Sequence, residues 1–164
     1  ERTRKVTRYA IHKDTVFDAE RLRGFASSLP EGYELRDLSA ADYPGLKVED
    51  WSGDFCSQYA DWADYDAHGL GVLAWYQGKP IAGASSYSWF PGGIEIEINT
   101  LPEHRRKGLA LACASSLILR CLENGLYPSW DAANLSSVAL AEKLGYRLKG
   151  EYTVYYYSTE EPMP

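Results

Sequence analysis

A run of three basic residues, 105–107, precedes Gly108 at the junction of two segments of different character. Residues 94–100 alternate between apolar and polar side chains, which is the period of a half-buried strand. Residues 109–122 contain too few polar side chains for a surface helix and are typical of a helix packed against a sheet. The first N–H groups of a helix lack partners and carry the positive end of its dipole, so they favour an anion. The turn therefore predicts a phosphate site, with a helix cap surrounded by solvated charges as the alternative.

A second candidate segment follows at residues 126–146. Residues 126–131 are a candidate short strand, and Asn134 is a good N-cap for the helix expected after it. Gly145 is a good terminator for the same helix. The sequence therefore predicts strand, turn and helix in that order, downstream of the basic turn.

Both segments resemble signatures of the GNAT superfamily of N-acetyltransferases. The spacing Arg-x-x-Gly-x-Ala at 105–110 is similar to the Gln/Arg-x-x-Gly-x-Gly/Ala turn that cradles the pyrophosphate of coenzyme A in that superfamily. The segment from Asn134 to Tyr146 resembles the Asn-x-x-Ser/Ala…Leu-Gly-Phe/Tyr signature that follows the fifth strand. Further stretches are similar to one subfamily, typified by zwittermicin A resistance acetyltransferases. These stretches are 54–58, 83–88, 93–100 and 151–155.

The resemblance implies an α/β architecture, the GNAT acyl-CoA N-acyltransferase fold. In this fold a central mixed sheet is splayed at the cofactor strand and flanked by helices. Acetyl-CoA is the implied cofactor, and no metal is expected. The residues expected to contact coenzyme A are Ile98, Asn99, Thr100, Arg105, Arg106, Lys107, Gly108, Leu109, Ala110, Asn134 and Ser137. For two of these an alternative is open, because Asn134 can serve only as a helix cap and Ser137 only as a small packing residue.

The implied chemistry is direct attack of a neutral amine on the acetyl thioester. Backbone N–H groups at the splayed end of the strand 95–100 are expected to polarise the thioester carbonyl. The amine must also lose a proton, and Glu95 and Glu97 project from one strand face as candidates for the base. The alternative for both is the ordinary polar face of an alternating strand. The acid is not assigned, because Ala141 stands where many GNAT enzymes carry a tyrosine.

Acidic and aromatic residues are interleaved upstream, in a region that helps to wall the acceptor site in GNAT enzymes. Together they could hold a cationic amine by charge and ring contact. The favoured alternative is a solvated acidic helix face over an aromatic core stripe. The residues concerned are Asp50, Trp51, Asp54, Tyr59, Asp61, Trp62, Asp64, Tyr65 and Asp66.

The pattern of the whole chain predicts one mixed sheet flanked by helices. Residues 1–30 are expected to form an appendage of one strand (6–12) and one helix (18–28), and residues 31–164 the acetyltransferase domain. Within that domain, strands are expected at 33–38, 70–76, 80–90, 94–100, 127–131 and 146–157. Helices are expected at 40–48, 54–67, 108–124 and 134–144.

Composition bounds the partners and the location. A formal net charge of −6 argues against a nucleic-acid partner, which would need a basic face. No apolar run approaches the length of a membrane span, so no membrane partner and a cytoplasmic location are expected. The chain is expected to be a monomer or a homodimer, with edge strands at 80–90 or 146–157 available for pairing. Because it does not begin with Met, a processed chain, a truncated one and a short homologue all stay open.

Three functions are compatible with these features. The first is an acetyl-CoA-dependent N-acetyltransferase that acts on a small-molecule amine, such as an aminated antibiotic or metabolite. The second is an acyl-CoA-binding regulatory module without turnover. The third is a nucleotide-phosphate enzyme that uses the basic turn for other chemistry, although the phosphate-binding and dinucleotide glycine patterns are missing. The sequence favours them in this order.

Overall fold

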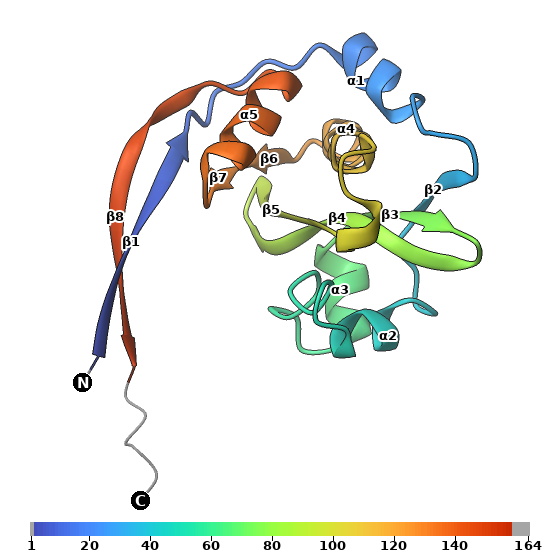
Figure 1. Ribbon diagram of the computed structural model, residues 1–164, viewed down its shortest axis with the longest axis horizontal. Coiled ribbons are helices and arrows are strands. Elements are labelled where there is room, and N and C mark those ends of the chain that lie inside the picture. Colours follow the sequence, from blue (N-terminus) through green and yellow to red (C-terminus); the bar gives the residue numbers. More distant parts are fainter. Residues whose placement is uncertain (1, 159–164) are drawn as a thin grey trace, which may run out of the picture. The chain divides into compact units, whose positions relative to one another are not determined.

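The computed structural model describes residues 2–158 (Figure 1). The chain divides into two compact units, each with its own sheet. Unit 1 combines the residues up to 16 with those from 130 onwards, and unit 2 comprises residues 17–129.

Unit 2 contains a five-stranded mixed sheet in the order β2-β3-β4-β5-β6. All neighbouring strands are antiparallel except β5 and β6, which are parallel. The expected mixed sheet is confirmed, but the single sheet is wrong, because the strand expected at 146–157 and the end of the one expected at 127–131 lie in a second sheet. The strands are β2 (Tyr33–Asp37), β3 (Gly71–Tyr76), β4 (Lys79–Phe90), β5 (Gly93–Thr100) and β6 (Tyr127–Ser129).

Helices cover both faces of this sheet (Figure 1). On one face, α4 packs against β3, β4 and β5, and α1 packs against α4. On the other face lie α2, α3 and the irregular segment that joins them. The helices are α1 (Ala19–Ala26), α2 (Tyr43–Val48), α3 (Trp62–His68), the single 3-10 turn η1 (Pro102–His104) and α4 (Leu109–Glu123).

The alternation of β5 sorts its side chains between the two faces. Ile94, Ile96 and Ile98 pack in the apolar cluster that includes residues of α4. Because successive side chains of a strand point to opposite faces, Glu95 and Glu97 lie on the face of the α2–α3 segment. The prediction that the two carboxylates share a face is therefore confirmed.

β5 loses its parallel neighbour partway along its length. Its register with β6 runs from Gly93 to Glu95 and then stops. On the other side, β4 continues to pair with β5 as far as Thr100. Within unit 2, residues 96–100 thus form a strand edge on the side away from β4, where no strand of this unit continues beside them.

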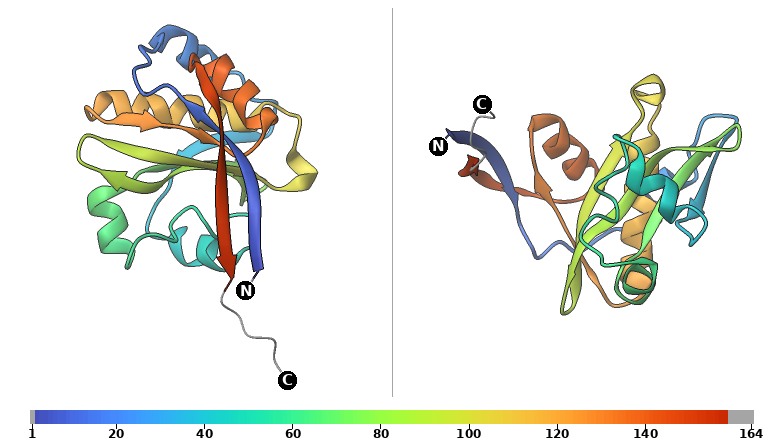
Figure 2. Two further views of the ribbon diagram at one scale, coloured as in Figure 1. Left: turned by 90° about the vertical axis from the view of Figure 1, so that its left-hand side faces the viewer. Right: turned by 90° about the horizontal axis from the view of Figure 1, so that it is seen from below.

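Unit 1 contains a three-stranded antiparallel sheet in the order β7-β1-β8. β1 (Arg2–Ile11) and β8 (Leu148–Ser158) run side by side along their whole length (Figure 2). β7 (Asp131–Ala132) pairs with the end of β1, and α5 (Leu135–Leu144) packs against β7. An ion pair supports the sheet, in which Arg8 Nε lies 2.6 Å from Asp131 Oδ1.

The predicted helix at 54–67 is wrong over most of its length. The structure has turns and bends up to residue 61, and α3 begins only at Trp62. Asp61 caps this helix by accepting a hydrogen bond from the N–H of Asp64 at 2.9 Å. The preceding stretch contains Ser52, Gly53 and Asp54, which favour turns over a helix.

The predicted appendage of residues 1–30 contributes to both units. Its strand is β1, which pairs with β8 in unit 1, and its helix is α1, which packs on α4 in unit 2. The boundary at residue 30 stays a prediction. Across residues 2–158, no helix has both the length and the apolar character needed to cross a membrane.

Candidate active site

The basic turn has an unusual backbone. Gly108 is left-handed, with φ of 76°, and Arg106 has a positive φ of 63°. A non-glycine residue in that region is uncommon, and alternating handedness turns successive N–H groups toward one concave side. The Gly108 carbonyl then accepts from the N–H of Ala112 at 3.1 Å and starts α4. This backbone at a helix N-terminus is compatible with the predicted anion nest, which stays a prediction.

The charges around the nest are available to solvent. Arg105, Arg106 and Lys107 are all exposed. Arg105 Nε also donates to the carbonyl of Thr100 at 3.3 Å, which ties the turn to the end of β5. The first turn of α4 contains Leu109, which is buried, and Ala110, which is half-buried. The first N–H groups of an α-helix have no partner within the helix, so those of α4 could donate to a phosphate.

Tyr33, Tyr76 and His104 form an aromatic cluster beside the start of the basic turn, called the clamp below. His104 Nδ1 lies 2.7 Å from the hydroxyl of Tyr33, and the Tyr33 ring stacks on Tyr76 with centroids 4.6 Å apart. The His104 ring lies 5.2 Å from that of Tyr76. The start of β2 and the end of β3 thus fix the residue that precedes Arg105. Tyr33 was not anticipated, because 71 residues separate it from His104 and no local pattern links them.

Replacing Tyr33 by phenylalanine is expected to weaken acetyl-CoA binding about three- to tenfold. The change keeps the ring but removes the bond to His104, and one hydrogen bond is worth about 0.5–1.5 kcal/mol. Calorimetric titration measures the effect. The matched control is Tyr76→Phe, which keeps the stacked ring and removes a hydroxyl that accepts from the exposed Gln77 side chain at 3.4 Å. Equal affinities in the two variants would show that the clamp does not position the turn.

The glutamates of β5 lie opposite a polar, buried part of β4. Glu97 is directly opposite Ser85, and Glu95 is opposite Ser88 across a bulge in β4. The Ser85 hydroxyl donates to the carbonyl of Phe55 at 2.7 Å and lies 2.8 Å from the Tyr65 hydroxyl. Both glutamates are half-buried. Only Glu97 lies in the part of β5 that has lost its β6 neighbour.

The segment 49–61, called the wall segment below, is seated on this face of β4 and β5. Phe55 is fully buried, and a Cβ on Gly83 would come within 2.8 Å of its ring. Glycine is therefore required at position 83 to let the ring rest on the strand. The Tyr59 hydroxyl donates to the carbonyl of Ser86 at 3.0 Å. Burial raises the pKa of Tyr59, which keeps its hydroxyl a donor at neutral pH.

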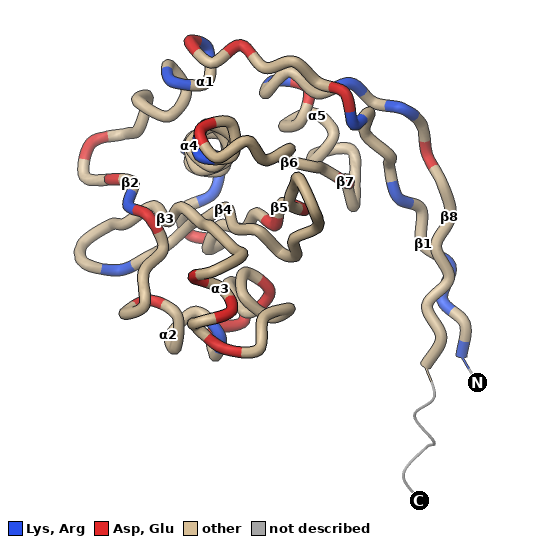
Figure 3. The backbone as a smooth tube through the Cα atoms, turned by 180° about the vertical axis from the view of Figure 1, so that it is seen from behind, with Lys and Arg blue, Asp and Glu red and all other residues tan. Residues whose placement is uncertain are grey.

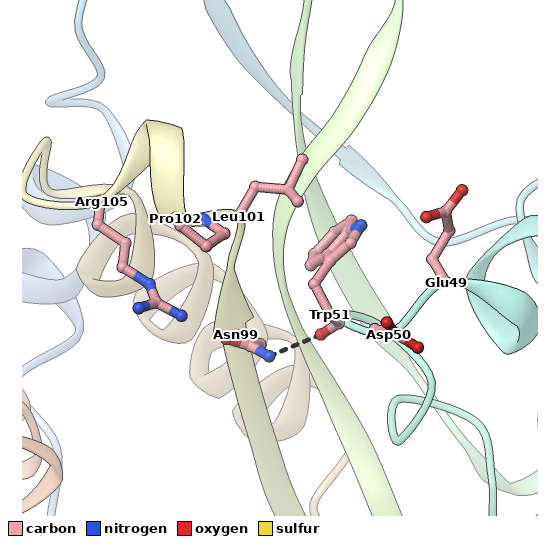
Figure 4. A pocket seen from close by; sticks show the side chains of 7 residues that line it. All are labelled: Glu49, Asp50, Trp51, Asn99, Leu101, Pro102 and Arg105. Carbon is pink, nitrogen blue, oxygen red and sulfur yellow. Dashed lines mark hydrogen bonds between the residues drawn. The ribbon is translucent and has the colours of Figure 1, made fainter.

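A cavity of about 430 Å³ lies between the wall segment and the end of β5 (Figure 4). Two carboxylates line one side, while Arg105 lies on the other (Figure 4). The lining residues are Glu49, Asp50, Trp51, Asn99, Leu101, Pro102 and Arg105. Acidic residues are numerous around α2 and α3 (Figure 3).

Asn99 lies where the cavity meets the strand, and its side chain is engaged within the protein. Nδ2 donates to the carbonyl of Trp51 at 2.7 Å, and Oδ1 accepts from the N–H of Thr100 at 2.9 Å. The expected contacts of Ile98, Asn99 and Thr100 with coenzyme A stay predictions. The structure adds that the Thr100 N–H already has an internal acceptor.

Several acidic and aromatic residues of the predicted acceptor wall have structural roles. Asp61 caps α3, and Asp64 accepts from the N–H of Ala60 at 2.9 Å. Tyr59 and Tyr65 belong to the buried apolar cluster on this face. For these four residues the structure favours caps and core packing over ligand contact. Asp50 and Trp51 are the members of the set that line the cavity.

Asn134 and Ser137 lie in unit 1, whereas the other predicted site residues lie in unit 2. Asn134 caps α5 by accepting from the N–H of Ser137 at 2.8 Å. The Ser137 hydroxyl accepts from the indole of Trp130 at 3.1 Å. Both residues thus have structural roles, and their contacts with coenzyme A stay predictions.

No acid is assigned at or near position 141, where the family resemblance implies a tyrosine. Ala141 is fully buried, and the Tyr152 hydroxyl donates to Asp131 Oδ2 at 2.6 Å. Tyr146 is buried, and its ring centroid lies 5.4 Å from that of Trp130. Burial, reinforced by the bond to Asp131, raises the pKa of Tyr152.

The three cysteines are expected to resist thiol reagents until the protein unfolds. Cys56, Cys113 and Cys121 are buried free thiols, and burial raises the pKa of each to about 12. Since the thiolate is the reactive form, about one thiol in 10⁴ is ionised at pH 8. Labelling with a disulfide reagent should be negligible in buffer and reach three groups per chain in guanidinium chloride. Rapid native labelling would contradict this assignment.

Comparison with known proteins extends these observations. The family model for GNAT acetyltransferase matches residues 1–155. An uncharacterized N-acetyltransferase of Bacillus subtilis (strain 168), YdfB, is 38% identical over 137 residues, which are 78% of this chain and 49% of that protein. The chain thus spans about half the length of this curated relative.

Solved structures agree with that match. A GCN5-related N-acetyltransferase-like protein from Streptococcus suis 89/1591 is 45% identical, with a TM-score of 0.91 over 93% of this chain and 61% of its own. The structure of AAC(6')-Iy in complex with the bisubstrate analogue CoA-S-monomethyl-acetylneamine is 19% identical. Its TM-score is 0.54 over 77% of this chain and 97% of its own, a likeness of fold alone.

Proposed function

Because the chain belongs to the GNAT acetyltransferase family, we propose that it transfers an acetyl group from acetyl-CoA to an amine of a small molecule. The observation that carries the proposal is the backbone nest of residues 105–110, at the end of the strand that bears Glu95 and Glu97. This arrangement combines an anion site with candidate proton acceptors along one continuous piece of chain.

The residues of the nest fit the pyrophosphate of acetyl-CoA. Gly108 leaves open space where a Cβ would stand, so its backbone can be approached closely. Arg105, Arg106 and Lys107 surround it with positive charge, which phosphate binding requires. Acetyl-CoA, when bound, supplies an activated acetyl thioester. Asn134 and Ser137 are proposed as further contacts on the basis of the family signature alone.

We assign the general base to Glu97 in preference to Glu95. The incoming amine must be neutral when it attacks, so a carboxylate has to accept its proton. Both glutamates are half-buried, but Glu97 lies on the edge of β5 that no longer has β6 as a neighbour, whereas Glu95 lies where β5 and β6 still pair. Backbone N–H groups of that edge, at residues 96–100, are proposed to polarise the thioester carbonyl.

The acceptor is proposed to approach from the cavity between the wall segment and β5. Glu49 and Asp50 give one side of this cavity a negative potential, and Trp51 adds an aromatic surface. These groups favour an amine that carries a further cationic centre. Neamine, whose acetyl derivative is part of the analogue bound to AAC(6')-Iy, is a suitable first probe of this kind.

A binding module without turnover is the second candidate. The buried Ala141 at the position of the usual tyrosine acid favours it, because a departing thiolate would have to take its proton from water. Such a module would bind acetyl-CoA through the same nest. The two proposals therefore differ only in whether acetyl transfer follows binding.

Release of free coenzyme A in the presence of amines tests the proposal. Acetyl-CoA is incubated with the protein and with neamine, spermidine, glucosamine or tyramine, and the thiol is measured with a disulfide dye. Amine-dependent release with a matching acetylated product by mass spectrometry is expected. Binding of acetyl-CoA without release for any amine would favour the module. The cytoplasmic location and the choice between monomer and homodimer stay predictions.

A further inference from the structure

We propose that Asn99 is a positioning residue, whose side chain fixes Trp51 and the wall segment against the end of β5. The inference rests on the proposed function, in which the wall segment borders the acceptor site. It places the Asn99 side chain beside the proposed acceptor site, whereas the sequence predicts a contact of Asn99 with coenzyme A.

The two ends of the Asn99 amide serve different parts of the chain. Oδ1 accepts from the N–H of Thr100, the last residue of β5, at 2.9 Å. Nδ2 donates to the carbonyl of Trp51 at 2.7 Å (Figure 4). Only an amide provides this acceptor and this donor on one short, planar group. A bridge therefore runs from the end of the strand to a residue 48 positions earlier in the chain.

The packing beside Asn99 explains why the bridge meets Trp51. Gly83 lies opposite Asn99 on β4, and its missing Cβ makes room for the ring of Phe55. The Trp51 ring packs edge-on against Phe55, with centroids 5.5 Å apart. Phe55 thus supports the indole, while Asn99 holds the backbone of the same residue.

The wall segment needs such bonds because it has little regular structure of its own. Its backbone forms turns and bends from residue 50 to residue 61. Bonds from β4 hold its later part, through Ser85 to Phe55 and Ser86 to Tyr59. The cavity residues Glu49, Asp50 and Trp51 precede those bonds, and Asn99 supplies the bond from β5 at that point. Loss of the hydrogen bond from Asn99 is therefore expected to free residues 49–51 before the rest of the wall segment.

The test uses Asn99→Asp, which keeps the shape and the acceptor to Thr100 but places an oxygen against the Trp51 carbonyl. Hydrogen–deuterium exchange of residues 49–55 is expected to rise about tenfold or more, because the lost bond is replaced by a repulsive pair of acceptors. Acetyl-CoA affinity of the same variant is measured by calorimetry, so that an effect on the cofactor is separated from release of the segment. Fluorescence of Trp51, isolated as the difference from Trp51→Phe in each background, should shift to the red as the indole becomes solvated.

Asn124→Asp is the matched control. Asn124 also donates from Nδ2 to a backbone carbonyl, that of Arg120, at 2.7 Å, but at the end of α4. This variant should leave exchange at 49–55 and the Trp51 emission unchanged. A general effect of exchanging asparagine for aspartate would appear in both variants.

Two results would overturn the inference. Unchanged exchange at 49–55 in Asn99→Asp would show that Asn99 does not hold the segment. A large loss of acetyl-CoA affinity, with the segment still protected, would assign the side chain to the cofactor instead. If the unsubstituted chain binds no acetyl-CoA, the proposed function fails, and the exchange and fluorescence data still decide whether Asn99 positions Trp51.

Discussion

Glu97→Gln is expected to lower kcat for amine acetylation by about 10²- to 10⁴-fold, which is the usual contribution of a general base. Glutamine keeps the size and the hydrogen-bonding oxygen of the side chain but cannot accept the proton at neutral pH. Acetyl-CoA affinity should change little, since Glu97 lies on β5 and not in the nest. Steady-state kinetics with the best amine of the panel, together with calorimetry, separates the two effects.

Glu95→Gln is the matched control for this prediction. The residue has the same charge, the same strand and the same half-buried exposure, but it lies where β5 and β6 still pair. Its kcat should fall by less than about tenfold, the effect of a modest electrostatic change. A larger loss in Glu95→Gln than in Glu97→Gln would move the base to Glu95. Full activity in both variants would remove carboxylate base catalysis from the proposal.

Gly108→Ala is expected to weaken acetyl-CoA binding by about 10- to 100-fold. The added methyl group enters the open space above the turn, and the left-handed backbone is unfavourable for alanine. Loss of one hydrogen bond to a charged phosphate, at about 1.5–3 kcal/mol, accounts for the range. Calorimetric titration of the variant with acetyl-CoA measures it.

Gly78→Ala separates the backbone cost from the binding effect. Gly78 lies in the β3–β4 turn with φ of 78°, close to the 76° of Gly108, and it also has nothing within 4 Å of its missing Cβ. Both variants should therefore lose about 1–2 kcal/mol of folding stability. Only Gly108→Ala should lose cofactor affinity. A similar loss in Gly78→Ala would point to global destabilisation and not to a phosphate site.

The sequence predicted best those elements whose side-chain period is unambiguous. β5 and α4 were expected at 94–100 and 108–124, and they lie at Gly93–Thr100 and Leu109–Glu123. The strict alternation of β5 also placed Glu95 and Glu97 on one face correctly. Between these two elements the glycine at 108 predicted a turn, and the structure adds that Arg106 shares its left-handed conformation.

The wall segment could not be predicted by the same reasoning. Its conformation depends on bonds to residues far away in the chain, such as Asn99 to Trp51 and Ser85 to Phe55. Its aromatic residues have a helix-like spacing, yet they pack into one cluster without forming a helix. The same limit applies to the clamp of Tyr33 on His104, a contact that only the folded sheet creates.

The most direct test of the central claim is a calorimetric titration of the purified chain with acetyl-CoA, followed by a competition with ADP. The proposal predicts one site per chain, with ADP binding at the same site but much more weakly because it lacks the pantetheine arm. Absence of binding by a folded protein, or equal affinity for ADP and acetyl-CoA, would contradict the assignment of the nest and the β5 edge as an acetyl-CoA site.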